Sequence, residues 1–517
     1  MTQGKPLIFG IIHIGSSSLS MRIVAYRGVN DAEVIEEVKK ETSFGEEVFL
    51  NKKLSFRSIR RLCTMLSGLR QLLADYRVTE YMVYATAVMR EAENRRAILD
   101  LIKVHTGFQV EVVDMPQEIY YKHFALHYEA EHLLRKMERP VGENFLFVDI
   151  TSGCVGLTVW EKGELKFQHN VHIGTLRLLE TFRLNQRDSL DFPQAMREYI
   201  HAVMLPLWDE IRQYHPSCLV LSGREARIMG ELMHVDMSQN AALVQPAAFH
   251  HFYEAVGNMS VQRLMSRYHL SDQWARSVLP TAHLYREILK NVPVNSLLMM
   301  GTSFLEAASL FYGAKRTKDP AIIEMRSHNL ELARSMAAGY FYEPKHARAM
   351  EEYSRVILDA LDEVNGLDER DAFLLRMAII LYETGKYVNL LEHNVHTWHI
   401  IRGIDVFGLS DKEKDTVACI AYYDHKGMPG EDDEPFRIVP EKAKMNVLKL
   451  IAVFRLARAM DMGRQQKLKH VSAHLKDNAL VIQYDSRENT ALESWVFEKE
   501  ADIFQNVFGL EARLERR

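Results

Sequence analysis

The 517-residue sequence contains only four cysteines, Cys63, Cys154, Cys218 and Cys419, and no two of them form a CxxC pair. Their wide separation indicates neither a disulfide framework nor a set of zinc ligands. No apolar run is long enough to span a bilayer, and the apolar segment 7–14 is too short for a signal peptide and lacks a cleavage-type sequence after it. We therefore expect a protein of the reducing cytoplasm with no membrane partner.

The sequence also lacks a large charge of one sign, because its formal net charge is −5 at pH 7. This balance gives no whole-chain signature of nucleic-acid binding, and no nucleic-acid partner is expected. Short basic runs either line a groove for an anionic chain or form ordinary solvated faces. These runs are 39–40, 52–53, 57–61, 315–318 and 464–470. The length exceeds what one hydrophobic core holds, so several domains are expected.

Two stretches of the chain, 9–25 (FGIIHIGSSSLSMRIVA) and 145–160 (FLFVDITSGCVGLTVW), have the same form and lie 136 residues apart. Each begins with an apolar run typical of a buried strand, turns through small residues and resumes an apolar run. Alignment by the turn places Ser16 on Ser152. Turns of small residues present backbone N–H groups that can hold phosphate, although such turns also serve backbone geometry alone. The pair predicts a duplicated strand–turn–strand unit at a domain-sized spacing.

The order of periodic and apolar segments predicts four domains. Strand-like and helical segments alternate over the first part of the chain, which indicates α/β lobes. From about residue 319 the pattern is helical nearly throughout, and the tail returns to strands and one helix. The predicted domains are lobe I (1–133), lobe II (134–317), an all-α domain (318–463) and a small α/β piece (464–517).

Six motifs follow one another along the chain: HIGSSS at 13–18, TAVMREAEN at 86–94, VEVVDMPQEI at 110–119, DITSGCVGL at 149–157, LSGREARI at 221–228 and LYETG at 381–385. In this order the sequence resembles the exopolyphosphatase/guanosine pentaphosphate phosphatase (Ppx/GppA) family, in its long form with a helical HD-like domain. The resemblance implies two ribonuclease-H-like lobes of the actin/hexokinase/heat-shock superfamily, with phosphate held in the cleft between them. It also implies that water attacks a terminal phosphoryl group, with Mg²⁺ assisting.

The resemblance gives the site residues their expected roles. Glu118 matches the family's catalytic base, although a glutamate in a first helical turn can also simply favour the helix dipole. Arg90 would bind phosphate through its guanidinium fork, and Asn94 would either orient Arg90 or cap a helix. Asp149 would hold Mg²⁺ or Mn²⁺. The expected phosphate ligands are Gly15, Ser16, Ser17, Ser18, Arg90, Asn94, Thr151, Ser152, Gly153, Ser222 and Gly223.

Several departures from the family's motifs count against metal-dependent hydrolysis. His13 stands where the first loop has an aspartate, and imidazole is a poor ligand for a hard cation. Thr151 and Ser152 replace a Gly-Gly pair, and Gly156 replaces the glutamate at the end of the second loop. The arginine expected after Gly301 is missing. Two carboxylates and one cation of the expected site are therefore lost.

The HD-like region departs from its pattern as well. Tyr382 and Glu383 occupy the paired position, which removes the defining His-Asp ligands, so no HD-type phosphohydrolase activity is expected. Four histidines remain as metal ligands or as ordinary surface and packing residues: His393, His396, His399 and His425. Helical spacing would place the first three near one helix face.

We predict from these residues an exopolyphosphatase-type phosphohydrolase that acts on inorganic polyphosphate or pppGpp, with Glu118 as the base. The alternative is a binding or regulatory protein that holds polyphosphate or (p)ppGpp in the same cleft without turnover. The intact TAVMREAEN motif favours the enzyme, whereas His13, Thr151 and Gly156 favour the binding protein. A nucleotide-dependent kinase of the same superfold is a weaker hypothesis, because the resemblance extends into the helical domain. The resemblance also implies a homodimer.

Overall fold

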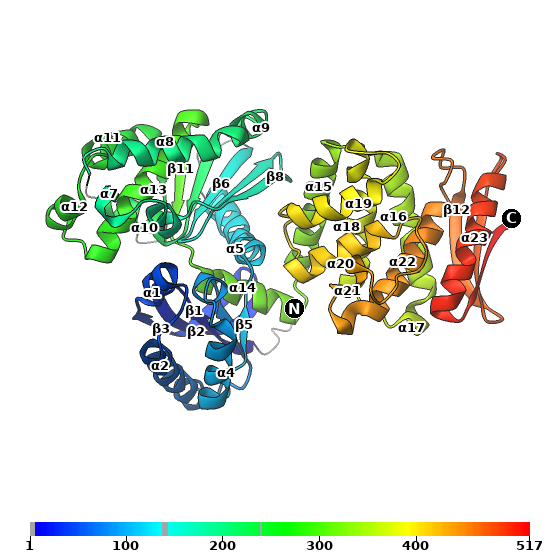
Figure 1. Ribbon diagram of the computed structural model, residues 1–517, viewed down its shortest axis with the longest axis horizontal. Helices are drawn as coiled ribbons and strands as arrows, with labels where there is room; N and C mark the ends of the chain where they lie inside the picture. Colours follow the sequence, from blue (N-terminus) through cyan, green and yellow to red (C-terminus); the bar gives the residue numbers. More distant parts are fainter. Residues whose placement is uncertain (1–5, 137–142, 188, 238–239) are drawn as a thin grey trace. The chain divides into compact units, whose positions relative to one another are not determined.

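The computed structural model describes residues 6–136, 143–187, 189–237 and 240–517 (Figure 1). The chain forms two compact units, Met1–Met325 and Arg326–Arg517. The first unit contains both predicted α/β lobes, and the second contains the helical region together with the tail.

Lobe I is built on a five-stranded sheet in the order β3-β2-β1-β4-β5. Strands β1, β2 and β3 form an antiparallel meander, and β4 and β5 continue the sheet parallel to β1. Helices α2 (Phe56–Asp75) and α4 (Arg95–Thr106) cover one face of this sheet, and α14 (Phe304–Thr317) lies on the other (Figure 1). The strands are β1 (Leu7–Ile14), β2 (Ser18–Gly28), β3 (Asp31–Glu41), β4 (Tyr81–Ala85) and β5 (Val110–Val112).

Lobe II is built on a six-stranded sheet in the order β10-β11-β9-β6-β7-β8. The sheet is antiparallel from β6 to β8 and parallel across β6, β9 and β11, and β10 adds an antiparallel edge. Its strands are β6 (Asn144–Ile150), β7 (Val155–Glu161), β8 (Glu164–Val171), β9 (Cys218–Ser222), β10 (Ala241–Val244) and β11 (Ser296–Met300). The order β8-β7-β6-β9-β11 repeats the strand order of lobe I, which confirms the predicted duplication.

The two turns of the duplicated unit repeat each other at the level of single hydrogen bonds. The Gly15 N–H donates to the Ser18 carbonyl oxygen at 2.9 Å, and the Thr151 N–H donates to the Cys154 carbonyl oxygen at 2.9 Å. These two turns face each other, since the Ser152 hydroxyl lies 3.4 Å from the Ser16 hydroxyl. The residues that sequence alignment placed on one another therefore meet in space.

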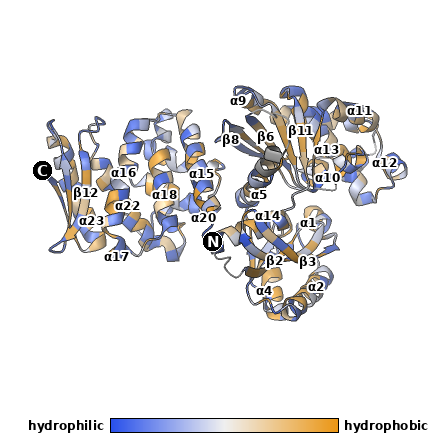
Figure 2. Ribbon diagram, turned by 180° about the vertical axis from the view of Figure 1, so that it is seen from behind, coloured by the Kyte–Doolittle hydropathy of each residue, from blue (hydrophilic) through white to orange (hydrophobic). Residues whose placement is uncertain are grey.

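Apolar periodicity explains how the helices cover the sheets. Serine N-caps such as Ser55, Ser271 and Ser303 begin α2, α13 (Asp272–Asn291) and α14, where a hydroxyl accepts a free backbone N–H. The longer helices of lobe II pack with the sheet in one hydrophobic core, and Figure 2 shows hydrophobic residues along its strands. They are α8 (Phe192–Met204), α10 (Gly223–Leu232), α11 (Pro246–Val256) and α13. Shorter helices are α1 (Phe44–Asn51), α3 (Ala87–Arg90), α6 (Thr175–Glu180), α7 (Leu184–Arg187), η1 (Leu205–Leu207), α9 (Trp208–Arg212) and α12 (Val261–Tyr268).

Helix α5 (Met115–Lys136) lies between the lobes beside α14 and carries Glu118, the predicted catalytic residue (Figure 1). It begins where the Asp114 carboxylate accepts the Gln117 N–H at 2.9 Å. The Trp160 indole N–H donates to His123 at 2.8 Å and so fastens α5 to β7 of lobe II. The first turns of α5 are thereby held between the two sheets.

The second unit is a helical bundle that shares its core with the tail. Its helices are α15 (Pro320–Ala338, which begins in the first unit), α16 (Pro344–Ala360), α17 (Asp362–Asn365), α18 (Glu369–Leu381), η2 (Thr384–Tyr387), α19 (His393–Gly403), α20 (Asp411–Tyr422), α21 (Glu434–Arg437), η3 (Glu441–Ala443) and α22 (Lys444–Ala459). The tail forms β12 (Lys469–Lys476), β13 (Ala479–Asp485), α23 (Ala491–Phe508) and β14 (Glu511–Arg516), in the sheet order β12-β13-β14. One hydrophobic core contains Phe454 of α22 together with Ile482 and Phe497 of the tail.

Across the described ranges, none of the helices is both long enough and apolar enough to pass through a bilayer.

Helix α14 can lie on lobe I because Gly313 leaves room for the Tyr26 ring of β2. A Cβ atom at Gly313 would come 2.4 Å from that ring, and Tyr26 is fully buried. We expect Gly313→Ala to destabilise the protein by about 1–3 kcal/mol, the usual effect of overpacking a core. Urea unfolding followed by circular dichroism measures the change.

Gly68→Ala is the matched control, because Gly68 lies exposed in α2 and a Cβ there would meet nothing within 4 Å. It should leave the stability unchanged or raise it by about 0.5–1 kcal/mol, since alanine favours a helix over glycine. Equal stabilities for Gly313→Ala and the unmodified protein would contradict the proposed close packing.

Candidate active site

A cavity of about 240 Å³ lies between the two lobes of the first unit, at the ends of β1 and β6. Both predicted loops, the start of α10 and the first turns of α5 line it. The predicted site residues that line it are Gly15, Ser16, Ser17, Ser18, Glu118, Thr151, Ser152 and Gly223. The remaining predicted residues, Arg90, Asn94, Asp149, Gly153 and Ser222, do not line the cavity wall.

The first loop presents its serine side chains to the cavity. The Ser16 carbonyl oxygen accepts the Gly45 N–H at 2.7 Å, which fixes the loop against the start of α1. The approach is close, because a Cβ atom at Gly45 would lie 2.5 Å from the Ser16 Cβ. The Ser17 hydroxyl accepts a hydrogen bond from the Arg224 guanidinium of α10, which connects this loop to lobe II.

The second loop satisfies its own backbone donors. The Thr151 hydroxyl oxygen accepts the Gly153 N–H at 3.3 Å and the Cys154 N–H at 3.1 Å. Gly174 packs directly against the same stretch, since a Cβ there would lie 2.3 Å from the Cys154 nitrogen. In the Gly-Gly form of this loop no side chain competes for these N–H groups, whereas here the Thr151 hydroxyl uses them.

Glu118 lies in the first turn of α5 and forms an ion pair with Arg90 of α3. The Arg90 Nη1 donates to Glu118 Oε2 at 2.7 Å and to the Val113 carbonyl oxygen at 2.8 Å. Burial alone would lower the pKa of Arg90, but the Glu118 carboxylate outweighs this effect and leaves the pKa raised. Arg90 thus holds the Glu118 carboxylate in place, and this carboxylate borders the cavity.

Asn94 lies outside the cavity and fastens two segments of lobe I. Its side-chain oxygen accepts the Leu54 N–H at 3.2 Å, and its amide donates to the Leu54 carbonyl oxygen at 2.9 Å. Both ends of the amide are therefore used within the fold. This placement gives Asn94 a structural role at the start of α4.

Asp149 ends β6 and has a buried lysine as its partner. The Lys122 ammonium, one turn after Glu118 on α5, donates to Asp149 Oδ1. The Ser222 hydroxyl donates to the same oxygen at 2.7 Å, because Asp149 and Ser222 are paired on the parallel strands β6 and β9. Lys122 and Asp149 are both about 5% exposed, and Lys122 reaches the cavity wall.

Sequence reasoning missed Lys122, although the chain contains a signal for it. The lysine follows Glu118 at i+4, and its neighbours Ile119, Tyr121 and Phe124 are all buried. A charged residue on such a face needs a buried partner, which the sequence of α5 alone does not reveal. Arg224 was also missed. Its guanidinium stacks over the Trp274 ring at 4.4 Å and lines the cavity.

His13 occupies the position in lobe I that Asp149 occupies in lobe II. Its Nε2 lies 3.1 Å from the Thr86 hydroxyl, and its ring packs against Phe304. Burial, with the positive charges of Lys122 and Arg90, lowers the pKa of His13 to about 3. The imidazole is therefore neutral at physiological pH.

Gly156 lies directly opposite Asp149 in the antiparallel pairing of β6 and β7. Ile119 of α5 covers it, because a Cβ at Gly156 would lie 3.1 Å from the Ile119 Cγ2. The Ile119 side chain thus fills the space beside Asp149 that a glutamate at position 156 would need.

In the second unit, the HD-like positions form hydrogen-bonded groups of their own. His346 lies 2.7 Å from Asp461 Oδ2 and 2.8 Å from the Tyr382 hydroxyl, and all three side chains are buried. Glu383 pairs with Arg464 and Lys386. The Tyr382 hydroxyl is thus engaged by His346, and the HD-like assignment itself stays a prediction.

The four histidines that the sequence analysis considered as metal ligands do not form one group. His393 is buried and its Nε2 lies 3.5 Å from Asp424 Oδ2, while His425 Nδ1 lies 2.5 Å from Asp424 Oδ1. His399 is exposed beside Trp398, and His396 is partly buried. Of the three spaced histidines of α19, only His393 joins the His393–Asp424–His425 cluster that could hold a metal ion.

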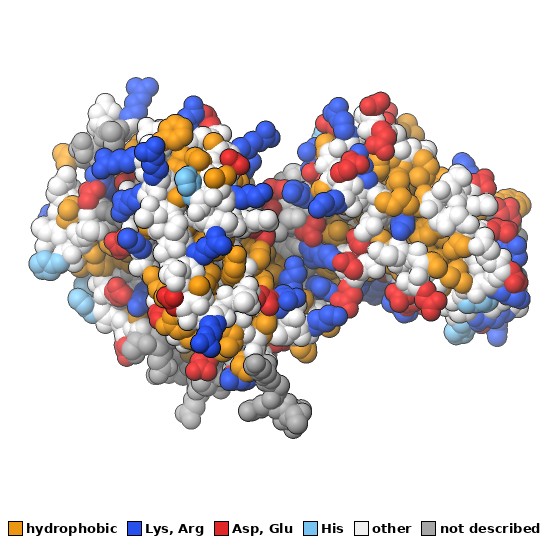
Figure 3. All heavy atoms as spheres, turned by 90° about the horizontal axis from the view of Figure 1, so that it is seen from below, with side chains coloured by type: hydrophobic (Ala, Val, Ile, Leu, Met, Phe, Trp, Pro, Cys, Tyr) orange, Lys and Arg blue, Asp and Glu red, His pale blue; other side chains and the backbone are white. Residues whose placement is uncertain are grey.

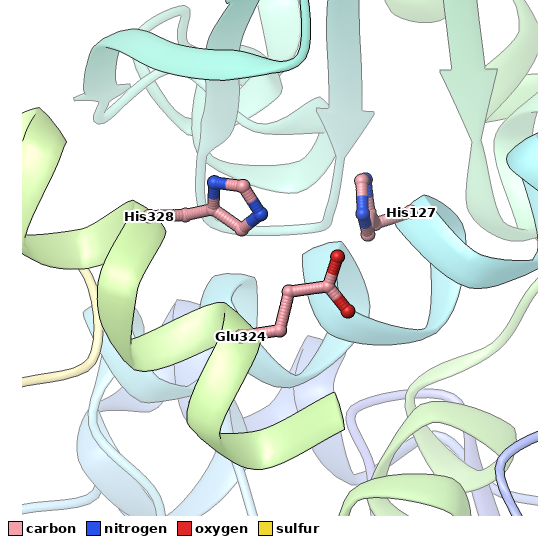
Figure 4. Close-up of side chains that lie close together, drawn as sticks. All are labelled: His127, Glu324 and His328. Carbon is pink, nitrogen blue, oxygen red and sulfur yellow. The ribbon is translucent and has the colours of Figure 1, made fainter. Parts of the chain in front are cut away.

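His127 and Glu324 lie in the first unit, on α5 and at the start of α15 (Figure 4). The Glu324 carboxylate accepts the Tyr128 hydroxyl at 3.0 Å, which connects the start of α15 to α5.

The cleft, the paired loops and the repeated strand order define a duplicated ribonuclease-H-like fold. A sequence model described as the Ppx/GppA phosphatase family matches residues 23–294, and a second, described as Ppx/GppA phosphatase, domain III, matches residues 331–501. The chain belongs to the Ppx/GppA phosphatase family.

Individual relatives are distant. The chain is 20% identical over 421 residues to a guanosine-5'-triphosphate,3'-diphosphate pyrophosphatase of Photobacterium profundum. This match covers 80% of this chain and 79% of the relative. An exopolyphosphatase structure from Cytophaga hutchinsonii matches with a TM-score of 0.51 at 18% identity, over 60% of this chain and 98% of that one. The PPX-GPPA enzyme of Aquifex aeolicus matches with a TM-score of 0.50 at 18% identity, over 59% and 99%. These structures support the fold.

The lowered pKa of His13 makes the stability of the protein depend on pH. The unfolded chain takes up a proton near pH 6.5, whereas the folded protein resists protonation until about pH 3. Stability is therefore complete above the unfolded pKa and falls as the pH drops below it. Between about pH 7 and about pH 5, the unmodified protein should lose up to about 2 kcal/mol more than His13→Gln. Urea unfolding at both pH values measures the difference.

His105→Gln is the control, because His105 is an exposed histidine of α4. This variant should lose the same stability as the unmodified protein over the same pH range. If His13→Gln also lost as much stability as the unmodified protein, the prediction that His13 is buried and neutral would be wrong.

Proposed function

We propose that the protein is a phosphohydrolase that releases terminal phosphate from inorganic polyphosphate or pppGpp in the cleft between its lobes. The observation that carries the proposal is the Glu118 carboxylate at the cavity wall, held by Arg90 at 2.7 Å. Family membership supports the reaction class, and relatives bear the names exopolyphosphatase and pppGpp-directed pyrophosphatase.

The reaction fits the groups that border the cavity. The Glu118 carboxylate takes a proton from a water molecule, and the water oxygen forms a bond to the terminal phosphorus. The phosphoanhydride bond breaks, so that orthophosphate leaves and a chain shorter by one phosphate remains. Arg224 and Lys122 supply positive charge, and the serine hydroxyls of the first loop supply neutral donors for the phosphoryl oxygens.

We expect the substrate to bind in the cleft rather than along a basic surface. Over the face of the molecule in Figure 3, Lys and Arg side chains lie among acidic and uncharged ones rather than in one continuous stripe. Of the basic runs in the sequence, 39–40 contributes Lys39 to the cavity wall. The end of a phosphate chain is therefore the part we expect to be bound. The homodimer stays a prediction from the resemblance, and the cytoplasmic location stays a prediction from the few, widely separated cysteines.

A second function is a binding protein that holds polyphosphate or (p)ppGpp without turnover. The observation that favours it is the second loop, whose Gly153 and Cys154 N–H groups donate to the Thr151 hydroxyl. Donors that are engaged within the loop stabilise a developing charge less well than free ones. Binding would persist because the cations of the cleft do not depend on this loop.

The two functions separate in an assay of phosphate release from long-chain polyphosphate and from pppGpp, in Mg²⁺, in Mn²⁺ and in EDTA. For the enzyme, we expect Glu118→Gln to reduce release by about 10²- to 10⁴-fold, because the general base is lost while the side chain keeps its shape. Glu93→Gln is the control, since Glu93 is an exposed carboxylate of lobe I.

Release by the unmodified protein that Glu118→Gln does not reduce would overturn the role of Glu118. Absence of release under every condition, with polyphosphate or (p)ppGpp binding that Arg224→Gln weakens, would establish the binding protein instead.

A further inference from the structure

The residues around Asp149 do not fit the divalent cation that the family resemblance implies. Mg²⁺ requires near-octahedral oxygen ligands, usually with one or two carboxylates. The three positions where carboxylates are expected hold the neutral His13, Asp149 and Gly156, which Ile119 covers. Asp149 Oδ1 is bonded to Lys122 and Ser222, so only Oδ2, which is buried and without a hydrogen-bond partner among the described residues, is left for a metal.

The site has lost negative charge, and its remaining carboxylate already has a cation. Relative to the family's motifs, positions 13 and 156 have each lost a negative charge, and the Lys122 ammonium is bonded to the carboxylate that remains. An ammonium in contact with Asp149 repels a second cation from the same oxygen atoms. One carboxylate needs one positive charge for neutrality, and Lys122 already supplies it.

We propose that the Lys122 ammonium takes the place of the divalent cation and binds the phosphate of the cleft directly, so that the protein holds its phosphorylated ligand without Mg²⁺. An ammonium carries three N–H donors, and the described contacts use one of them, to Asp149. Lys122 is one of the residues that line the cavity, beside Glu118 and Gly223. The other two donors are thus available to phosphate oxygens.

The backbone at the first residue of α10 leaves room for this ammonium. Gly223 has φ +89, a left-handed conformation that favours glycine, and a Cβ atom there would lie 3.1 Å from the Lys122 Nζ. A ligand atom can therefore approach the ammonium past position 223 without meeting a side chain.

This inference rests on the proposed phosphate-binding cleft, and its test separates the two. Binding of tripolyphosphate is measured by calorimetry in EDTA and again in Mg²⁺, corrected for the complex that Mg²⁺ forms with tripolyphosphate. We expect the unmodified protein to bind in EDTA with an affinity within about threefold of that in Mg²⁺, and Lys122→Gln to weaken binding on the order of tenfold to a hundredfold.

Two further variants keep the test decisive. Lys122→Gln leaves Asp149 buried and uncompensated, so Lys122→Gln/Asp149→Asn removes both charges together and answers the question if the single variant does not fold. It should lose affinity in EDTA as well, whereas a purely structural ion pair would change the unfolding temperature and leave the affinity intact. Lys103→Gln, an exposed lysine of α4, controls for net charge and should bind like the unmodified protein.

Each outcome has one meaning. Binding that appears only with Mg²⁺, or a folded Lys122 variant that binds like the unmodified protein, overturns the inference and leaves the proposed function in place. No binding of tripolyphosphate in either buffer overturns the proposed function itself, and the inference with it.

Discussion

The ion pair of Lys122 and Asp149 buries opposite charges where α5 meets the end of β6, and the cleft is arranged around it. Two isolated charges are costly to bury, and a buried pair is stable only when its geometry and hydrogen bonds are good. Here Ser222 supports the carboxylate from the neighbouring strand, and α5 is fixed to β7 through His123 and Trp160. Removing one partner of such a pair typically costs about 3–5 kcal/mol, so the pair constrains both lobes.

The duplicated lobes use the same turn in different ways. The serines of the first loop line the cavity, while in the second loop Thr151 engages the backbone N–H groups of its own turn. The sequence position that bears Asp149 in lobe II bears the neutral His13 in lobe I. A symmetric backbone thus supports an asymmetric site, with its positive charge coming from Lys122 on the helix between the lobes and Arg224 on α10.

Local patterns predicted the fold well, because apolar runs and small-residue turns determine strands and hairpins by themselves. They located the two loops and aligned Ser16 with Ser152, while Glu118 was predicted from the family resemblance. They did not reveal Lys122, because its partner lies 27 residues away and only tertiary packing brings the two together. Asn94 was predicted to bind phosphate, but its side-chain amide bonds the Leu54 backbone instead. Sequence spacing does not predict this contact, because tertiary packing brings the two residues together.

The tail was predicted as a separate piece, yet Ile482, Phe497 and Phe504 lie in one core with Phe454 of α22. A polypeptide ending at residue 463 would therefore present the apolar side of α22 to solvent. Exposed surface of that kind promotes self-association, so the bundle is not an autonomous module that can be exchanged or expressed alone. The last helix and strands of the chain cover this apolar side of α22.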